Sequence, residues 1–293
     1  MKKVALLIVY NHRYDKNIPV LEKIYAGRFD YIYHIVPFYD GTQENVIPVY
    51  ESSYYFSGYL AQAYVHLKDK GFTHFFIVAD DMVIHPKIHQ ENLWEKTGIG
   101  QEDCFLPRFV YMQERGLSWD HTMAGMKYKV KQIGAEISNI LPSRDQAESC
   151  FRKFHLPLGE IDWHRLIPRS WKDLSFELRR YPFSRKLDYP LVGGYCDILL
   201  LPAAEMPSFC AYCGAFSATK LFVEIAIPTA MALSARTIVT QDDIRLKNGD
   251  IWEKNEIEQF ARKYDYSVAK LEKNWPEGLL FVHPVKLSKW KWE

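Results

Sequence analysis

The first 85 residues alternate between short apolar runs and amphipathic stretches. Residues 4–10 form a continuous apolar run, which is typical of a strand covered on both faces, and residues 31–36 and 75–78 predict two further strands. Apolar positions at helical spacing predict a helix over residues 17–27, capped by its first residue, and another over residues 54–70. The order strand, helix, strand, helix, strand indicates a mostly parallel sheet with right-handed crossovers.

The rest of the chain is less regular, above all between residues 91 and 190. Pro228 predicts a kink or break in a long helix of the C-terminal third. No repeat, linker or low-complexity segment divides the chain, so we expect one compact α/β domain with helices flanking a mostly parallel central sheet. The remaining predicted elements are helices at residues 123–140, 144–154, 217–235 and 252–263 and strands at residues 197–201, 236–240 and 279–282.

Composition excludes some classes of function. The chain has 37 Lys and Arg against 36 Asp and Glu, so a net charge of +1 provides no general attraction for a nucleic acid backbone. Its five cysteines are odd in number and lie in apolar segments, which favours reduced thiols in the cytoplasm. The first apolar run is too short for a signal peptide, and no window approaches the roughly 20 apolar residues of a membrane span. Aromatic residues make up 15% of the chain, which suits either an aromatic-rich core or a protein that stacks sugar faces.

Two adjacent carboxylates, Asp80 and Asp81, follow the predicted strand at residues 75–78. Like charges at short range raise each other's pKa, and a hard divalent cation is the simplest way to neutralise them. Mg²⁺ or Mn²⁺ takes one or two protein carboxylates and completes its shell with water and substrate phosphate oxygens. The pair therefore predicts a metal-bound nucleotide diphosphate, and the alternative is that Asp81 caps a turn starting at Met82.

The loop at residues 11–15 follows the first strand. In open α/β sheets ligands bind beyond the carboxyl ends of the strands, so this loop is expected to contact the nucleotide. Asn11 and Arg13 are its polar candidates, and Tyr10 or Tyr14 is expected to stack on the base.

The run Phe-Phe-Ile-Val-Ala-Asp-Asp-Met-Val-Ile-His-Pro at residues 75–86 resembles the Asp-x-Asp segment of GT-A-class nucleotide-sugar glycosyltransferases. In that class the motif binds the metal and the donor diphosphate. Ala79 stands where the first aspartate is usual. The resemblance therefore implies that Asp81 binds the Mn²⁺ or Mg²⁺ and that Asp80 is a second ligand or a ribose contact.

The C-terminal run His-Pro-Val-Lys-Leu-Ser-Lys-Trp at residues 283–290 is similar to the His-x-x-Gly-x-x-Lys-Pro-Trp segment of glycogenin-like and lipopolysaccharide galactosyltransferases. It departs from that segment in having Lys286 at the glycine position and no proline before Trp290. The likeness implies that His283 completes the metal site and that Lys286 or Lys289 neutralises phosphate charge. Alternatively, the basic and aromatic tail contacts an anionic membrane surface.

Two further carboxylates are candidate catalytic groups. Glu224 lies among apolar residues, and burial would raise its pKa towards that of a base able to deprotonate an acceptor hydroxyl. The alternative is a structural carboxylate satisfied by backbone N–H groups or by Arg236. Asp197, which follows a glycine pair, is the second candidate.

Together these features predict a GT-A-like, hexosyltransferase-like enzyme that moves a sugar from a nucleotide donor, a UDP-sugar being favoured, to a glycan or lipid-linked acceptor. The resemblance implies bacterial surface polysaccharide assembly, in the cytoplasm or peripherally at the inner membrane. Residues 1–90 would bind the nucleotide sugar, residues 91–190 form an irregular helical insertion, and residues 191–293 supply the acceptor side and the C-terminal metal and diphosphate segment.

Two other functions stay open. A nucleotidyltransferase of sugar phosphates shares the sheet and the metal, but normally has a glycine-rich loop that this chain lacks after its first strand. A non-catalytic glycan-binding protein on the same fold is favoured by Ala79. Two other motifs are weaker evidence for a site. Asp242 and Asp243 form a second carboxylate pair, but they lie in a polar loop. The Cys-x-x-Cys at residues 210–213 has no second pair to complete a zinc site.

Overall fold

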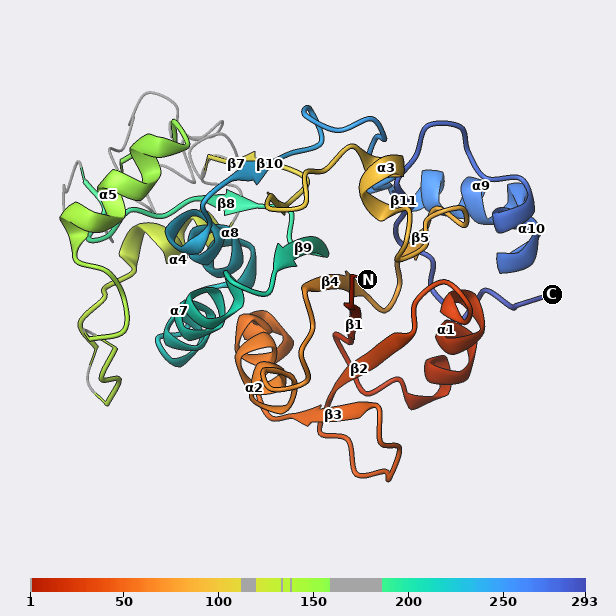
Figure 1. Cartoon of the computed structure of the whole chain (residues 1–293), viewed down its shortest axis with the longest axis horizontal. Coiled ribbons are helices and arrows are strands. Elements are labelled where there is room, and N and C mark those ends of the chain that lie inside the picture. Colours follow the sequence, from red (N-terminus) through yellow and green to blue (C-terminus); the bar gives the residue numbers. More distant parts are fainter. Residues whose placement is uncertain (1, 112–119, 133, 138, 159–185) are drawn as a thin grey trace, which may run out of the picture.

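The computed structural model describes residues 2–111, 120–132, 134–137, 139–158 and 186–293. Within these ranges a seven-stranded sheet lies at the centre of the molecule, in the order β10-β6-β9-β4-β1-β2-β3 (Figure 1). Its strands are β1 (Val4–Val9), β2 (Tyr31–Pro37), β3 (Val46–Val49), β4 (His74–Ala79), β6 (Cys104–Phe105), β9 (Ile198–Pro202) and β10 (Ile238–Val239).

The sheet is mostly parallel, as the sequence predicts. β1 pairs in parallel with β2 and β4, β2 with β3, and β6 with β10, whereas β9 runs antiparallel between β4 and β6. Every residue of β1 and of β4 is buried, because helices cover both faces of the sheet. The prediction of a mixed α/β fold with a mostly parallel sheet is confirmed.

Successive side chains of β1 enter two different cores. Leu7 faces the core under α2, α7 and α8, while Leu6 faces the core that includes α1 and the C-terminal segment (Figure 1). The described helices are α1 (Ile18–Tyr25), α2 (Ser57–Leu67), α3 (Leu93–Thr97), α4 (Asp120–Lys127), α5 (Arg144–Lys153), α7 (Met206–Ala218), α8 (Val223–Ser234), α9 (Lys254–Lys263) and α10 (Val268–Lys273). None of them is long and apolar enough to cross a membrane.

The predicted single helix at residues 217–235 is wrong. Lys220 adopts a left-handed conformation with φ of 58°, and the Leu221 N–H donates to the Phe216 carbonyl, which ends α7. Pro228 lies inside α8 and does not divide it. The helix predicted over residues 123–140 is also too long, because α4 ends at Lys127.

Within the described ranges, two small sheets accompany the main one. β5 (Val83–Ile84) pairs antiparallel with β11 (Phe281–Val282), and β7 (Phe109–Val110) pairs antiparallel with β8 (Gly193–Gly194). The first pair joins the carboxyl end of β4 to the C-terminal tail, about 200 residues further along the chain. It therefore sets which side chains meet at the edge of the main sheet.

Candidate functional site

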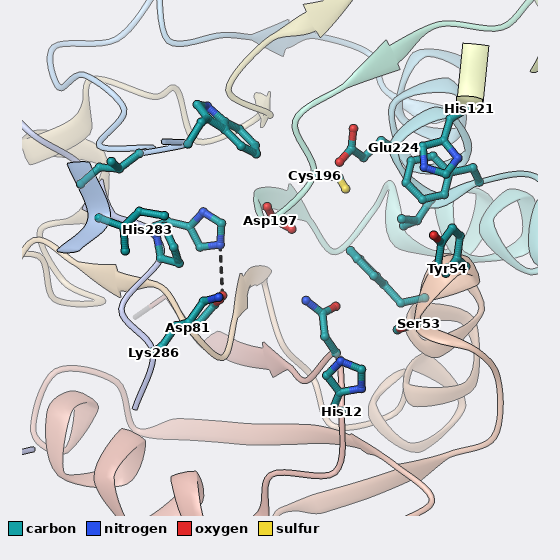
Figure 2. A pocket seen from close by; sticks show the side chains of 18 residues that line it. His12, Ser53, Tyr54, Asp81, His121, Cys196, Asp197, Glu224, His283 and Lys286 are labelled. Atoms are coloured by element: carbon teal, nitrogen blue, oxygen red, sulfur yellow. Dashed lines mark ion pairs between the residues drawn. The ribbon is translucent and has the colours of Figure 1, made fainter. Parts of the chain in front are cut away.

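The β5 and β11 pair brings His283 to Asp81. Val282 is opposite Val83, and the Val285 N–H donates to the Asp81 carbonyl at 2.6 Å, so the residues just before β5 are held against those just after β11. The Nε2 atom of His283 lies 3.1 Å from Oδ1 of Asp81 (Figure 2). Asp81, from the Asp-x-Asp-like segment, and His283, from the C-terminal segment, are the two residues that the resemblances associate with a metal, and they are in contact.

The Asp81 carboxylate carries an unsatisfied atom. Its Oδ1 is buried and makes no hydrogen bond within the described part of the chain, although it lies at ion-pair distance from His283. A buried carboxylate oxygen without a hydrogen bond is costly in free energy. Burial disfavours a charged imidazole, but the contact with Asp81, reinforced by Asp197 and Asp250, raises the pKa of His283 above its ordinary value.

The His283 ring is fixed from behind. Its Nδ1 lies 3.0 Å from the Tyr195 hydroxyl, and the Tyr195 ring stacks on Phe281 at 5.9 Å between centroids and 8° between planes. The His283 backbone N–H donates to the Gly249 carbonyl, and a side chain at Gly249 would meet the Phe281 carbonyl at 2.0 Å. These contacts leave Nε2 directed at Asp81, as an outer partner does for a metal-binding histidine.

Asp80 has a different environment from its neighbour. Only 5% of the residue is exposed, and burial, followed by the charge of Asp81, raises its pKa to about 7. The Asn17 side-chain amide donates to it at 3.3 Å, so Asn17 contacts Asp80 and forms no side-chain cap on α1. Asp80 lines a cavity of about 250 Å³ together with Asn11, Tyr14 and Lys286.

A larger cavity of about 470 Å³ contains the Asp81 and His283 pair at one side. Asp197, Cys196 and Glu224 lie between that pair and an aromatic side formed by His121 and Tyr54 (Figure 2). Burial raises the pKa of Asp197, and the charge of His283 opposes that rise. The cavity is lined by Asn11, His12, Ser53, Tyr54, Phe56, Asp81, His121, Cys196, Asp197, Phe222, Val223, Glu224, Ile251, Trp252, Ile257, His283, Pro284 and Lys286.

The described residues form no cluster of three or more His, Cys, Asp or Glu side chains arranged around a metal. Asp81 and His283 provide two ligand atoms, and the unsatisfied Oδ1 fits a cation. Mg²⁺ and Mn²⁺ need few protein ligands when water and substrate phosphates supply the rest. The residues present are therefore compatible with a metal that binds together with a phosphorylated ligand.

Tyr10 lies in the core and not at the predicted nucleotide site. The residue is fully buried, and its hydroxyl lies 2.8 Å from Nδ1 of His34, whose Nε2 lies 2.9 Å from Glu22. A ring without exposed surface cannot stack on a nucleotide base, so the predicted stacking by Tyr10 is wrong. Tyr14, which is 47% exposed and lines the smaller cavity, is the remaining tyrosine candidate.

Tyr10→Phe is expected to lower the free energy of unfolding by about 1–3 kcal/mol, because it removes a hydrogen-bond partner of the buried His34. Urea unfolding would measure this loss. The nucleotide affinity of the folded variant should equal that of the wild-type protein. A loss of affinity without a loss of stability would show that Tyr10 contacts the nucleotide after all.

Two predicted donor contacts lie outside both cavities. Arg13 forms ion pairs with Asp15 and Asp40, so its guanidinium is already occupied by carboxylates. Lys289 lines a third cavity of about 420 Å³ between α9 and the tail, whereas Lys286 lines all three. Of the two lysines, Lys286 is the one next to Asp80 and Asp81.

The other residues that the sequence offered for a site line neither cavity. Arg236, which the sequence offers as one partner for Glu224, pairs with Glu205 at 3.4 Å. Asp243 accepts the backbone N–H of Thr240 in a loop after β10. All five cysteines are free thiols, and Cys210 and Cys213 are buried within α7.

Sequence reasoning missed the residues that complete the larger cavity. Tyr195 orients His283, while Tyr54 and Trp252, each 56% exposed, line the cavity. The high aromatic content was the available signal, but it did not distinguish these residues from aromatics of the core. Comparison with protein-family models and with curated proteins gave no match for this chain.

Proposed function

We propose that this protein is a metal-dependent glycosyltransferase that moves a sugar from a nucleotide-sugar donor to a glycan or lipid-linked acceptor. The observation that carries the proposal is the contact of Asp81 with His283 at the carboxyl end of β4, with a buried carboxylate oxygen that lacks a hydrogen bond. Two such ligands suit Mn²⁺ or Mg²⁺ bound together with a diphosphate. When bound, the metal stabilises the charge that develops on the leaving diphosphate.

The two neighbouring cavities suit the two ends of a nucleotide sugar. Asp81 and Lys286 line both, so a diphosphate at their junction would have its nucleoside in the smaller cavity and its sugar in the larger. The Lys286 amine is exposed and forms no ion pair with any described residue, which leaves it available for phosphate charge. Asn11, Tyr14 and Asp80 would then contact the nucleoside.

The acceptor would enter from the opposite side of the larger cavity. Asp197 and Glu224 line that cavity beyond the Asp81 and His283 pair (Figure 2). A carboxylate with a raised pKa, such as Asp197, removes a hydroxyl proton more effectively than an ordinary one. In this proposal one of the two carboxylates accepts the proton of the acceptor hydroxyl and the other binds the acceptor.

Calorimetry with UDP, GDP and CMP, with Mn²⁺ and after its removal by EDTA, tests the proposal. At least one nucleotide is expected to bind about tenfold more tightly with the metal, because its diphosphate supplies the missing ligands. UDP is the favoured nucleotide. No metal-dependent gain for any nucleotide would contradict the proposal.

A product assay separates the open alternatives. The proposed enzyme should release a nucleoside diphosphate slowly from its nucleotide sugar, with water as acceptor. A nucleotidyltransferase would instead release pyrophosphate from a nucleoside triphosphate and a sugar phosphate. Neither product would form with a non-catalytic glycan-binding protein.

A further inference from the structure

Trp252 presents a fixed aromatic face to the larger cavity. It is 56% exposed, yet its indole N–H donates to Asp250 at 2.7 Å, and Asp250 is paired with Arg108 at 3.3 Å. The ring also lies edge-on to Tyr195 at 6.1 Å. The polar atom of the indole is therefore satisfied within the protein, while its apolar face stays in contact with solvent.

A second aromatic surface lines the same cavity. His121 stacks on Phe222 with 3.5 Å between ring centroids and 10° between planes, and Tyr54 lies 5.6 Å from each of them. Tyr54 belongs to a short 3₁₀ helix capped by the Ser52 side chain, which accepts the Tyr54 N–H. This surface is therefore built from three segments distant in sequence, the 3₁₀ helix, α4 and the residue before α8. Its Tyr54 side chain belongs to a residue that is 56% exposed.

Carboxylates lie between the aromatic surfaces. Glu224 lies near His121, Asp197 lies nearer to His283, and Lys286 lies beside Asp81 (Figure 2). Among the described lining residues, Lys286 is the one Lys or Arg side chain. The space between the two aromatic surfaces therefore combines apolar faces with carboxylate hydrogen-bond acceptors.

We infer that the space between these two aromatic surfaces binds an uncharged pyranose ring, the acceptor sugar, on the face of Trp252. A pyranose has an apolar face of C–H groups, which pack on an aromatic ring, and a rim of hydroxyl donors, which suit carboxylate acceptors. Acidic sugars are disfavoured because their carboxylates would approach Asp197 and Glu224. The assignment of this ring as the acceptor rests on the proposed glycosyltransferase function.

Saturation-transfer NMR and calorimetry with a panel of methyl glycosides test the inference without nucleotide or metal. The neutral probes are the methyl glycosides of glucose, galactose and N-acetylglucosamine, and the acidic probes are those of glucuronic acid and N-acetylneuraminic acid. At least one neutral probe is expected to bind more tightly than both acidic ones. Trp252→Ala should weaken that probe about tenfold, whereas Trp252→Phe should retain affinity within about threefold.

Tyr50→Ala is the matched control. Tyr50 is 64% exposed, packs against Phe38 and is not among the residues that line the cavity, so its removal should leave glycoside binding unchanged. Wild-type affinity in Trp252→Ala, tighter binding of an acidic probe, or no neutral binding at about 20 mM would overturn the inference. Because no nucleotide is present, these results are independent of the metal-dependent nucleotide test. Failure of the sugar-binding inference can therefore be told apart from failure of the proposed glycosyltransferase function.

Discussion

Asp81→Asn is expected to lower kcat/KM for sugar transfer by about 10³-fold and to abolish the metal-dependent gain in nucleotide affinity. The substitution keeps the size of the side chain but removes the negative charge that a divalent cation requires. Oδ1 of Asp81 is buried beside Nε2 of His283, so the substitution also removes the charge that raises the pKa of His283. Steady-state kinetics and calorimetry with Mn²⁺ would measure the two effects.

Asp242→Asn provides the matched control for this prediction. Asp242 is exposed in the loop after β10, and it belongs to the other adjacent pair of aspartates in the chain. The same loss of one charge there should change neither activity nor nucleotide affinity by more than about twofold. If D81N kept a tenth or more of the wild-type activity with metal present, the metal-binding role of Asp81 would be wrong.

The main features of the sheet were predictable because buried parallel strands have a simple pattern. All six residues of β1 and all six of β4 are buried, which explains the continuous apolar runs and the position of Asp80 immediately after β4. The direction of β9 had no such signal. Its antiparallel pairing with β4 depends on the path of more than 100 intervening residues, and local hydrophobicity does not encode that path.

The candidate site was predictable only in part. Asp81 could be placed at a strand end from its neighbours, but its contact with His283 depends on β5 and β11, each only two residues long and without a periodic pattern. Tyr10 ends an apolar run, and no local feature indicates that its hydroxyl is buried against His34. Trp252 is exposed, but which cavity it faces is determined by the fold.

Phe281→Ala is expected to lower the free energy of unfolding by about 3–5 kcal/mol, a large fraction of the roughly 5–15 kcal/mol typical of a domain. Phe281 is fully buried in β11, and its ring stacks on Tyr195, which in turn contacts His283. The resulting cavity would lie behind Tyr195, the residue that holds the imidazole. We therefore expect a loss of metal-dependent nucleotide affinity in addition to the loss of stability, measured by calorimetry under conditions where the variant is folded.

Phe209→Ala distinguishes loss of site geometry from general loss of stability. Phe209 is also fully buried, but it lies in α7 and in the core on the other face of the sheet. A similar cost in unfolding free energy is expected from its truncation. Nucleotide affinity with Mn²⁺ should stay close to the wild-type value, because no described contact joins Phe209 to His283. Equal affinities in the two variants would mean that the packing of β11 does not position His283, and that the Asp81 contact is maintained by the tail after residue 283 alone.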